Sequence, residues 1–327
     1  MPDSTTGPGA GPGRGPGPLT TYLLIALLCL IWGSTWLVIK EGLRDLPPFT
    51  SCAVRFTLAS AVFALLAGWL HRREGGARPG WRLSAVQGVF SFAIPYGVVY
   101  ASETVLPSSL ASVLWAVFPI LVAITGHFVL PGERLGPRDW GGFGVGFLGV
   151  VLLFVTDLRA IGPGALAVGA AYFLSPLASA VGNTLVKRDG GHVSSALLNR
   201  NGMVLGALLM WGVALALERD RESNWSGFAL FSVTYLALVG TVVAFGLYFW
   251  LLRWAPAYKL SLIAYVIPGV ALALGWSLGD EAVGLHTLLG AGLILGGVGV
   301  VARGGPSRPA TSGNDCLLYT SPSPRDS

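Results

Sequence analysis

The chain has 327 residues, of which 53% are apolar and only 11% are charged, and its mean hydropathy is +0.66. Soluble domains carry about 25% charged residues, so this composition excludes a water-soluble globule and predicts an integral membrane protein. The net charge of +5 comes mostly from loop arginines, which in a membrane protein indicate orientation and not nucleic-acid binding.

Ten apolar runs follow a Gly/Pro-rich start over residues 1–18, which we expect to be a disordered tail. Each run is close to the roughly 20 residues that a helix needs to cross a bilayer, and only helices satisfy their own backbone groups in spans of this length. The fold class expected is therefore all-α. The predicted spans are 20–40, 49–70, 83–102, 108–130, 138–156, 163–186, 195–217, 228–252, 257–278 and 285–302.

The loop arginines and lysines fall mainly in the even-numbered connections between these spans, and most densely between Arg72 and Arg82. Cytoplasmic loops carry this excess, so we expect a multi-pass protein of the cytoplasmic membrane with both termini in the cytoplasm. Residues 304–327 leave the pattern for a Ser/Pro/Arg run. We expect this tail to be disordered and partly non-native.

The chain repeats itself, which indicates a duplicated unit. Five spans in each copy is an odd number, so the second copy begins on the opposite side of the membrane and the repeats are inverted. The marker residues recur in the same order and at nearly the same spacing: Pro107, Ser112, Pro119, Glu133 and Gly142 in one copy and Pro256, Ser261, Pro268, Glu281 and Gly290 in the other.

These markers, with Trp32-Gly33-Ser34, Lys40 and Leu46-Pro47-Pro48, resemble EamA-type proteins of the drug/metabolite transporter superfamily over 19–303. The resemblance implies ten helices in two inverted five-helix repeats, 19–157 and 158–303, around a central cavity. It also implies alternating access for a small molecule, often an exported one. The sixth span lacks the Trp-Gly-Ser motif, so nothing transfers from Trp32 to it.

Polar and aromatic residues inside the spans are candidates for the substrate cavity. Tyr172, Ser179 and Asn183 share one helical face of the sixth span, where they either line a cavity or bond to a neighbouring helix. Aromatic rings with a polar group can orient a metabolite, although packing is the alternative for each of them. The further candidates are Trp32, Ser34, Tyr96, Tyr100, Trp115 and Tyr265.

Arg55 and Arg200 lie about six residues inside the second and seventh spans. A charge there is costly, so these arginines either pair with an anionic substrate or extend to the nearer interface. Pro119 and Pro268 are predicted hinges, because proline loosens a helix. Glu133 and Glu281 stand between spans, where we favour helix capping over proton coupling.

The sequence therefore favours a secondary transporter that exports a small metabolite or drug-like molecule across the membrane. A gated channel and, less favoured, a membrane enzyme are the alternatives. Cys29, Cys52 and Cys316 stand alone and the histidines are scattered, so we expect no metal and no cofactor. The partners expected are the substrate and membrane lipid, with no nucleic acid. Glycine-rich fifth and tenth spans pack within one chain or form a homodimer.

Overall fold

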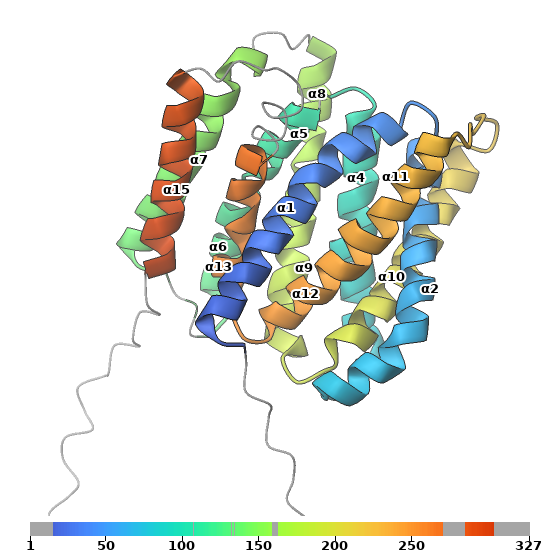
Figure 1. Cartoon of the computed structure of the whole chain (residues 1–327), viewed down its shortest axis with the longest axis horizontal. Helices are drawn as coiled ribbons and strands as arrows, with labels where there is room; N and C mark the ends of the chain where they lie inside the picture. Colours follow the sequence, from blue (N-terminus) through green and yellow to red (C-terminus); the bar gives the residue numbers. More distant parts are fainter. Residues whose placement is uncertain are drawn as a thin grey trace, which may run out of the picture.

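The computed structural model describes residues 16–106, 108–131, 133, 135–158, 163–270 and 285–303. Residues 1–15 and 304–327 of the tails, Glu281 and residues 271–278 of the predicted ninth span lie outside these residues. Within them the chain is helical, apart from one isolated β-bridge between Ala77 and Val193 (Figure 1).

The elements of the first half are α1 (Pro18–Gly42), α2 (Pro48–Glu74), α3 (Trp81–Val86), the π-helix η1 (Gln87–Ala93), α4 (Ile94–Glu103), α5 (Ser108–Trp115), α6 (Phe118–Val129) and α7 (Pro137–Leu158). Those of the second half are α8 (Pro163–Tyr172), α9 (Leu174–Gly190), α10 (Ser195–Leu217), α11 (Gly227–Ala237), the π-helix η2 (Leu238–Val243), α12 (Ala244–Leu252), α13 (Ala257–Ser261), a helical segment over 263–270, and α15 (Leu285–Arg303).

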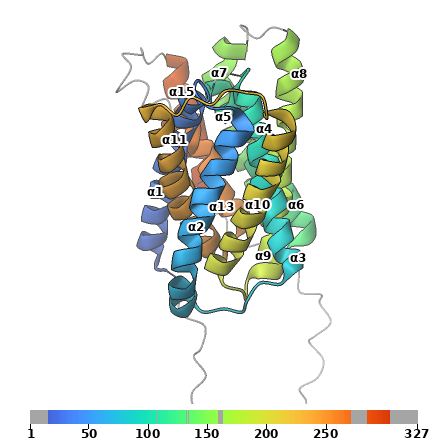
Figure 2. The ribbon, with the colours of Figure 1, turned by 90° about the vertical axis from the view of Figure 1, so that its right-hand side faces the viewer.

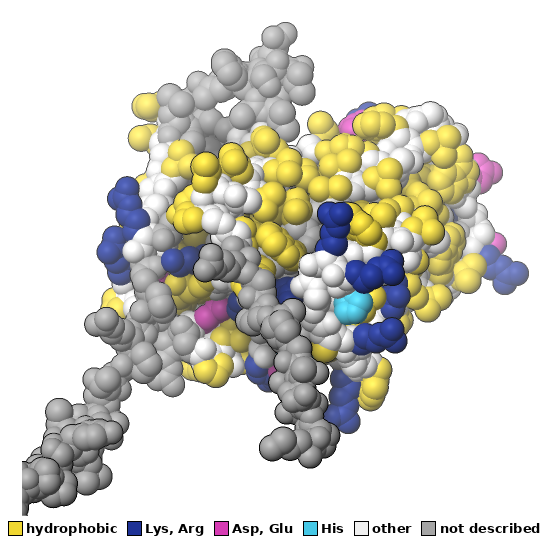
Figure 3. Space-filling view, turned by 60° about the horizontal axis from the view of Figure 1, so that its bottom comes forward, with side chains coloured by type: hydrophobic (Ala, Val, Ile, Leu, Met, Phe, Trp, Pro, Cys, Tyr) yellow, Lys and Arg dark blue, Asp and Glu magenta, His cyan; other side chains and the backbone are white. Residues whose placement is uncertain are grey.

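Five of the described helices are long and apolar enough to cross a membrane: Pro18–Gly42, Pro48–Glu74, Trp81–Glu103, Ser195–Leu217 and Gly227–Leu252. The outer surface of the bundle is apolar as well, with Leu65 and Phe128 more than four-fifths exposed. Figure 3 shows apolar side chains over the flank and Lys and Arg gathered at one end. Such a surface suits lipid and not water.

Three predicted spans are interrupted, which the uninterrupted ranges of the sequence analysis did not anticipate. The fourth breaks between α5 and α6, the sixth between α8 and α9, and the ninth at Leu262. Proline explains the first two breaks, because its ring displaces the carbonyl four residues earlier and it has no N–H to donate. For Pro119 that carbonyl belongs to Trp115, the last residue of α5. For Pro176 it belongs to Tyr172, the last residue of α8.

Helices α2 and α10 form an antiparallel pair whose ends cap one another, at the right of Figure 1. At the end of α2, Glu74 accepts hydrogen bonds from the Ser194 and Ser195 hydroxyls (2.5 and 2.6 Å) and from the Ala196 N–H (2.9 Å), at the start of α10. After α10, Glu218 accepts the N–H groups of Phe49 and Thr50 at the start of α2 (2.9 and 2.7 Å). Each carboxylate supplies the acceptors that a helix N-terminus lacks.

A second antiparallel pair, α7 with α15, closes the opposite end of the long axis (Figure 1). A Cβ added at Gly149 would lie 2.7 Å from the Gly290 carbonyl oxygen, and one at Gly142 would lie 2.6 Å from the Val301 side chain. These glycines therefore let two backbones approach, as small residues do between membrane helices. Part of the predicted glycine stripe thus packs within the chain.

Each half also holds a lysine at one end of its helices. Lys40, near the end of α1, donates to the carbonyls of Glu103 and Leu106 (2.5 and 3.2 Å). Lys187, near the end of α9, donates to those of Leu252 and Ala255 (2.5 and 2.8 Å). The acceptors Glu103 and Leu106 correspond to Leu252 and Ala255 by the same shift along the chain that relates Pro119 to Pro268. In both halves the lysine is favoured there because a helix presents unpaired carbonyls at its C-terminus.

Helices α1, α11 and α12 form the near layer in Figure 1, with α4 and α9 behind them, and Figure 2 shows this layering from the side. α1 begins and α15 ends at the same end of the bundle. The main buried cluster lies between the layers, and the cavity described next opens within it.

Candidate functional site

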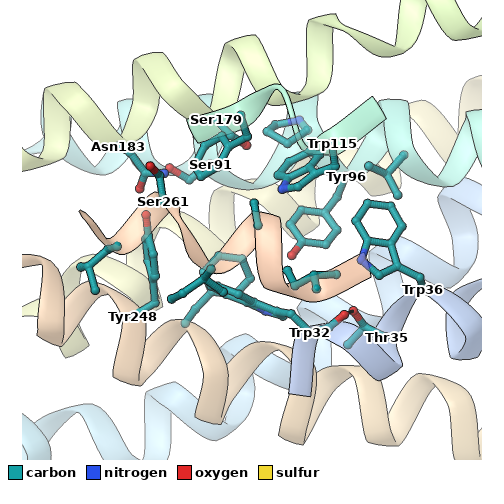
Figure 4. A pocket seen from close by; sticks show the side chains of 18 of the residues that line it. Trp32, Thr35, Trp36, Ser91, Tyr96, Trp115, Ser179, Asn183, Tyr248 and Ser261 are labelled. Atoms are coloured by element: carbon teal, nitrogen blue, oxygen red, sulfur yellow. Dashed lines mark hydrogen bonds between the residues drawn. The ribbon is translucent and has the colours of Figure 1, made fainter. Parts of the chain in front are cut away.

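A cavity of about 90 Å³ lies between α1, η1, α4, α9, α12 and α13. A buried site needs about 10–15 Å³ for one water molecule, so this space can take several waters or a small organic molecule. Figure 4 shows polar groups at one end of it, near Asn183 and Ser261, and tryptophans with Tyr96 at the other. The cavity is therefore amphipathic along its length.

Aromatic rings form most of the wall. They pack edge to face or tilted on one another, as Trp36 does on Trp115 (centroids 6.1 Å apart) and Trp32 on Tyr248 (5.3 Å). Such contacts fix the rings with little rotamer freedom and present a preformed apolar surface. The aromatic residues that line the cavity are Trp32, Trp36, Tyr96, Trp115, Phe118, Phe245, Tyr248 and Phe249.

Three polar atoms of this wall have no hydrogen-bond partner among the described residues: Trp32 Nε1, Asn183 Oδ1 and the Tyr248 hydroxyl. Asn183 and Tyr248 are only 5% and 3% exposed. Leaving a buried polar atom unpaired costs on the order of 1–3 kcal/mol, so these atoms are expected to find a partner in water or ligand. They offer a donor, an acceptor and a hydroxyl that can act as either.

Neutral hydroxyl groups complete the polar end, where Ser261 donates to the Tyr258 carbonyl (2.8 Å) and Ser91 to Gln87 Oε1 (3.3 Å). Thr35, which lies beside Trp32 and Trp36 in Figure 4, donates to the Trp32 carbonyl (2.8 Å). Ser179 also lines the cavity. Among the described lining residues none carries a charge, so a ligand with net charge would find no counter-ion in this wall.

Five of the predicted cavity residues lie in this wall: Trp32, Tyr96, Trp115, Ser179 and Asn183. Trp32 comes from the first span and Tyr96 from the third, which the apolar pattern alone had not brought together. Their position is what the sequence led us to expect, and their role in binding stays a prediction.

Four other candidates do not line this cavity, because their polar groups are used or buried elsewhere. The Ser34 hydroxyl bonds to the Ile31 carbonyl and Tyr235, and the Tyr265 hydroxyl donates to the Phe143 carbonyl (3.1 Å). The Tyr100 hydroxyl accepts from Arg55 (3.2 Å), and Tyr172 is fully buried where α8 ends. These four residues pack against other parts of the protein, which is the alternative that the sequence analysis gave for such residues.

Arg55 is buried, but its guanidinium is occupied by the protein. Nε donates to Thr241 Oγ1 (2.8 Å), and the two other nitrogens donate to Tyr100 (3.2 Å) and to the Gly240 carbonyl (3.3 Å) in η2. The guanidinium also lies 4.7 Å from the centroid of the Tyr96 ring, a cation–π contact. Arg55 therefore ties α2 to η2 behind the cavity wall.

Arg200 does not match Arg55. It is half-buried and donates to the Asn201 side chain (2.9 and 3.1 Å), away from the cavity. The buried polar residue at this level of α10 is Asn199, which accepts from Gln87 in η1 (3.0 Å) and donates to the Phe245 carbonyl (3.2 Å). Neither arginine lines the cavity, so this wall gives no support to pairing with an anionic substrate, one of the two alternatives considered for them.

The predicted hinge at Pro119 lies in the first turn of α6, directly after the break in the fourth span. Pro268 lies within the helical segment 263–270, after the break at Leu262. Glu133 is a helix cap, but for the other half of the chain, because its carboxylate accepts the N–H of Ala257 at the start of α13 (2.9 and 3.1 Å). Burial raises the pKa of the Glu133 carboxyl, and the Ala257 hydrogen bond and the charge of Lys187 oppose that shift.

The cavity residues predicted from the sequence did not include Thr35, Ser91, Tyr248, Ser261, Trp36, Phe245 and Phe249, all of which line the cavity. Trp36 is four residues from Trp32 and Phe249 four from Phe245, so both pairs share a helix face. That spacing could have found them. No three His, Cys, Asp or Glu side chains come together within the described residues to hold a metal ion.

Comparison with known proteins assigns the family. The sequence model of the EamA-like transporter family matches the chain twice, over residues 19–155 and 166–303. The chain belongs to this family.

Two of its bacterial relatives are described as uncharacterized transporters. The uncharacterized transporter YoaV of Bacillus subtilis is 25% identical, over 82% of this chain and 92% of its own length. The uncharacterized inner membrane transporter YedA of Escherichia coli K12 is 29% identical, over 87% of this chain and 92% of its own. A solved crystal structure that is 21% identical superimposes with a TM-score of 0.72 over 87% of this chain and 98% of the other, which shows a shared fold.

Family and fold together make this a multi-pass membrane protein related to transporters, with a cavity between its helices. The bacterial relatives place no substrate in that cavity. The lining residues of the cavity therefore indicate which ligand it can bind.

Proposed function

We propose that the chain is a secondary transporter that exports a small molecule across the cytoplasmic membrane by alternating access. The cavity carries this proposal, because it combines a rigid aromatic wall with three unpaired polar atoms at Trp32, Asn183 and Tyr248. A saturable binding site needs such directed hydrogen bonds in addition to apolar contact.

The architecture that we propose for this transport is two inverted five-helix repeats that cross the membrane ten times. It is supported by the antiparallel pairing of α2 with α10 and of α7 with α15, which are corresponding helices of the two repeats. The π-helices η1 and η2 lie within corresponding continuous spans, the third and the eighth. A pseudo-two-fold axis in the membrane plane relates segments in this way, and the binding site then lies near the midplane.

Both termini are proposed to be cytoplasmic. Four exposed arginines lie around the connection between α2 and α3: Arg72 and Arg73 in the last turn of α2, Arg78 in the connection, and Arg82 at the start of α3. Lys and Arg gather in Figure 3 at the end of the bundle where α1 begins and α15 ends (Figure 1). This asymmetry follows the positive-inside rule.

The substrate class favoured is a neutral or zwitterionic molecule with a flat or bulky apolar part and at least one hydrogen-bonding group. Its apolar part would pack near Trp36 and Trp115, and its polar group would lie near Asn183 and Tyr248 (Figure 4). An anion is disfavoured because no described lining residue carries a charge, and because Arg55, outside the lining, donates from all three of its nitrogens to Thr241, Tyr100 and Gly240.

A thermal-shift screen of the purified protein against amino acids, sugars, nucleosides and cationic drugs would identify ligands. Each hit is then tested for counterflow in proteoliposomes, with Asn183→Leu as the cavity variant and Arg200→Lys as the matched control. We expect saturable counterflow that Arg200→Lys retains and Asn183→Leu reduces at least tenfold, corresponding to one lost hydrogen bond of about 1.4 kcal/mol. Non-saturating conductance would instead support a gated channel.

A further inference from the structure

A fully buried carboxyl group lies at the end of α4, within the part of the chain that the structure describes. Glu103 is 0% exposed, and neither carboxylate oxygen has a hydrogen-bond partner among the described residues. The sequence analysis found no acidic group for a proton relay, because Glu103 ends its apolar run and resembled a surface residue.

Glu103 lies one helical turn beyond the cavity. It is four residues after Val99, which lines the cavity, so the two side chains share a face of α4. On the neighbouring helix α1, Lys40 follows the lining residue Trp36 by the same interval. Lys40 and Glu103 thus form a layer that covers the cavity at the end where α1 and α4 finish.

The cation nearest in this layer does not hydrogen-bond to the carboxylate. Lys40 Nζ donates to the main-chain carbonyls of Glu103 and Leu106. Arg55 on α2 and Tyr172 at the end of α8 are the other titratable groups that interact with Glu103 electrostatically. Arg55 is occupied by Tyr100 and η2, and the Tyr172 hydroxyl has no partner among the described residues.

The other elements against α4 add no further charge there. η1 and α5 contain no titratable residue, and those of α9, which are Lys187, Arg188 and Asp189, lie at its opposite end. Ser175, at the start of α9, donates to the Pro95 carbonyl of α4 and orients this end of the helix.

Three other glutamates of the described residues have the hydrogen-bond donors that Glu103 lacks. Glu74 and Glu218 each accept several N–H or hydroxyl hydrogen bonds, and Glu133 accepts the Ala257 N–H at both oxygens. These groups are solvated as anions by the protein. A carboxylate buried without donors is far less stable than the neutral acid.

We infer that Glu103 is a proton-binding site of the transport cycle. It holds a proton while the Lys40–Glu103 layer is closed, and it releases the proton to water, with Lys40 beside it as counter-ion, when that layer opens. The only change at Glu103 is loss or gain of H⁺ on the carboxyl group. Rearrangement of the layer would thereby link substrate movement to the proton gradient, an inference that rests on the proposed transport function.

Infrared spectroscopy of the full-length protein tests the proton without any ligand. At neutral pH we expect a protonated-carboxyl C=O band that Glu222→Gln, an exposed control, retains and Glu103→Gln loses. Because glutamine mimics the neutral acid, Glu103→Gln should also melt close to wild type. If the difference spectrum shows carboxylate bands disappearing instead, Glu103 is ionised and the inference is wrong.

Proteoliposomes with an imposed pH gradient test the coupling, using each screened compound that gives counterflow. One coupled proton and a one-unit gradient allow up to about tenfold accumulation. We expect accumulation in wild type and a ratio near one in Glu103→Gln, with counterflow retained. Equal accumulation by both proteins overturns the coupling role of Glu103. Absence of counterflow from wild type counts against the transporter proposal itself, and the infrared result then still decides whether Glu103 holds a proton.

Discussion

Replacing Arg55 by lysine separates a structural arginine from a substrate-binding one. Arg55 makes three hydrogen bonds that a single ammonium group cannot reproduce, and it is 1% exposed. If lysine keeps one of the three, two are lost, at about 1.5 kcal/mol each for bonds to a charged group. The expected destabilisation is therefore about 3 kcal/mol, before any loss of the contact with the Tyr96 ring.

The assay is thermal unfolding of the purified protein, followed by intrinsic tryptophan fluorescence. A loss of about 3 kcal/mol corresponds to a decrease in Tm on the order of 5–10 °C for a chain of this size. Arg200→Lys is the matched control, and it should change Tm little because Arg200 bonds only to its neighbour Asn201 among the contacts described. If Arg55→Lys has the same Tm as wild type and its Tm no longer rises when a ligand is added, Arg55 pairs with substrate and our assignment is refuted.

Three further tests, with five substitutions in all, address the packing, the breaks and the caps. Gly149→Ala should lower Tm, since its Cβ would meet the Gly290 carbonyl at 2.7 Å, whereas Gly144→Ala faces open space and should stabilise α7 by up to about 1 kcal/mol; equal shifts would contradict this. Pro119→Ala and Pro268→Ala should each slow counterflow more than they lower expression, and unchanged flux in both would remove their hinge role. Glu218→Gln should cost about 2 kcal/mol in thermal unfolding, because its oxygens accept two N–H groups of α2, and an unaltered Tm would show that water replaces it.

Apolar run length and proline spacing were enough to predict the helices and their duplication. The runs mark where the helices are, and Pro119 with its copy Pro268 indicates that one unit occurs twice. They could not show that the spans are interrupted, because a run of apolar residues reads the same whether its helix is continuous or broken. Pro119 and Pro176 carried that signal for two of the breaks, because each lies four residues after the last residue of the preceding helix.

The candidate site was harder to predict, because helical periodicity gives the face of a residue and not its neighbour. Ser34 and Asn183 are both polar residues inside apolar runs, yet Ser34 bonds to Tyr235 while Asn183 faces the cavity. Tyr235, the partner of Ser34, lies 201 residues further along the chain, so no local pattern could identify it. Glu103 was missed for the same reason, since its burial depends on helices α1 and α8 and on nothing adjacent to it in sequence.

The reciprocal caps between α2 and α10 have a consequence for the order in which the protein is made. Glu218 lies 169 residues after Phe49, whose N–H it accepts, so α2 leaves the ribosome long before its capping carboxylate exists. Glu74, in contrast, is already present when Ser194 is synthesised. The second half therefore finds its cap waiting, while the first half completes its own helix only after most of the chain has been translated.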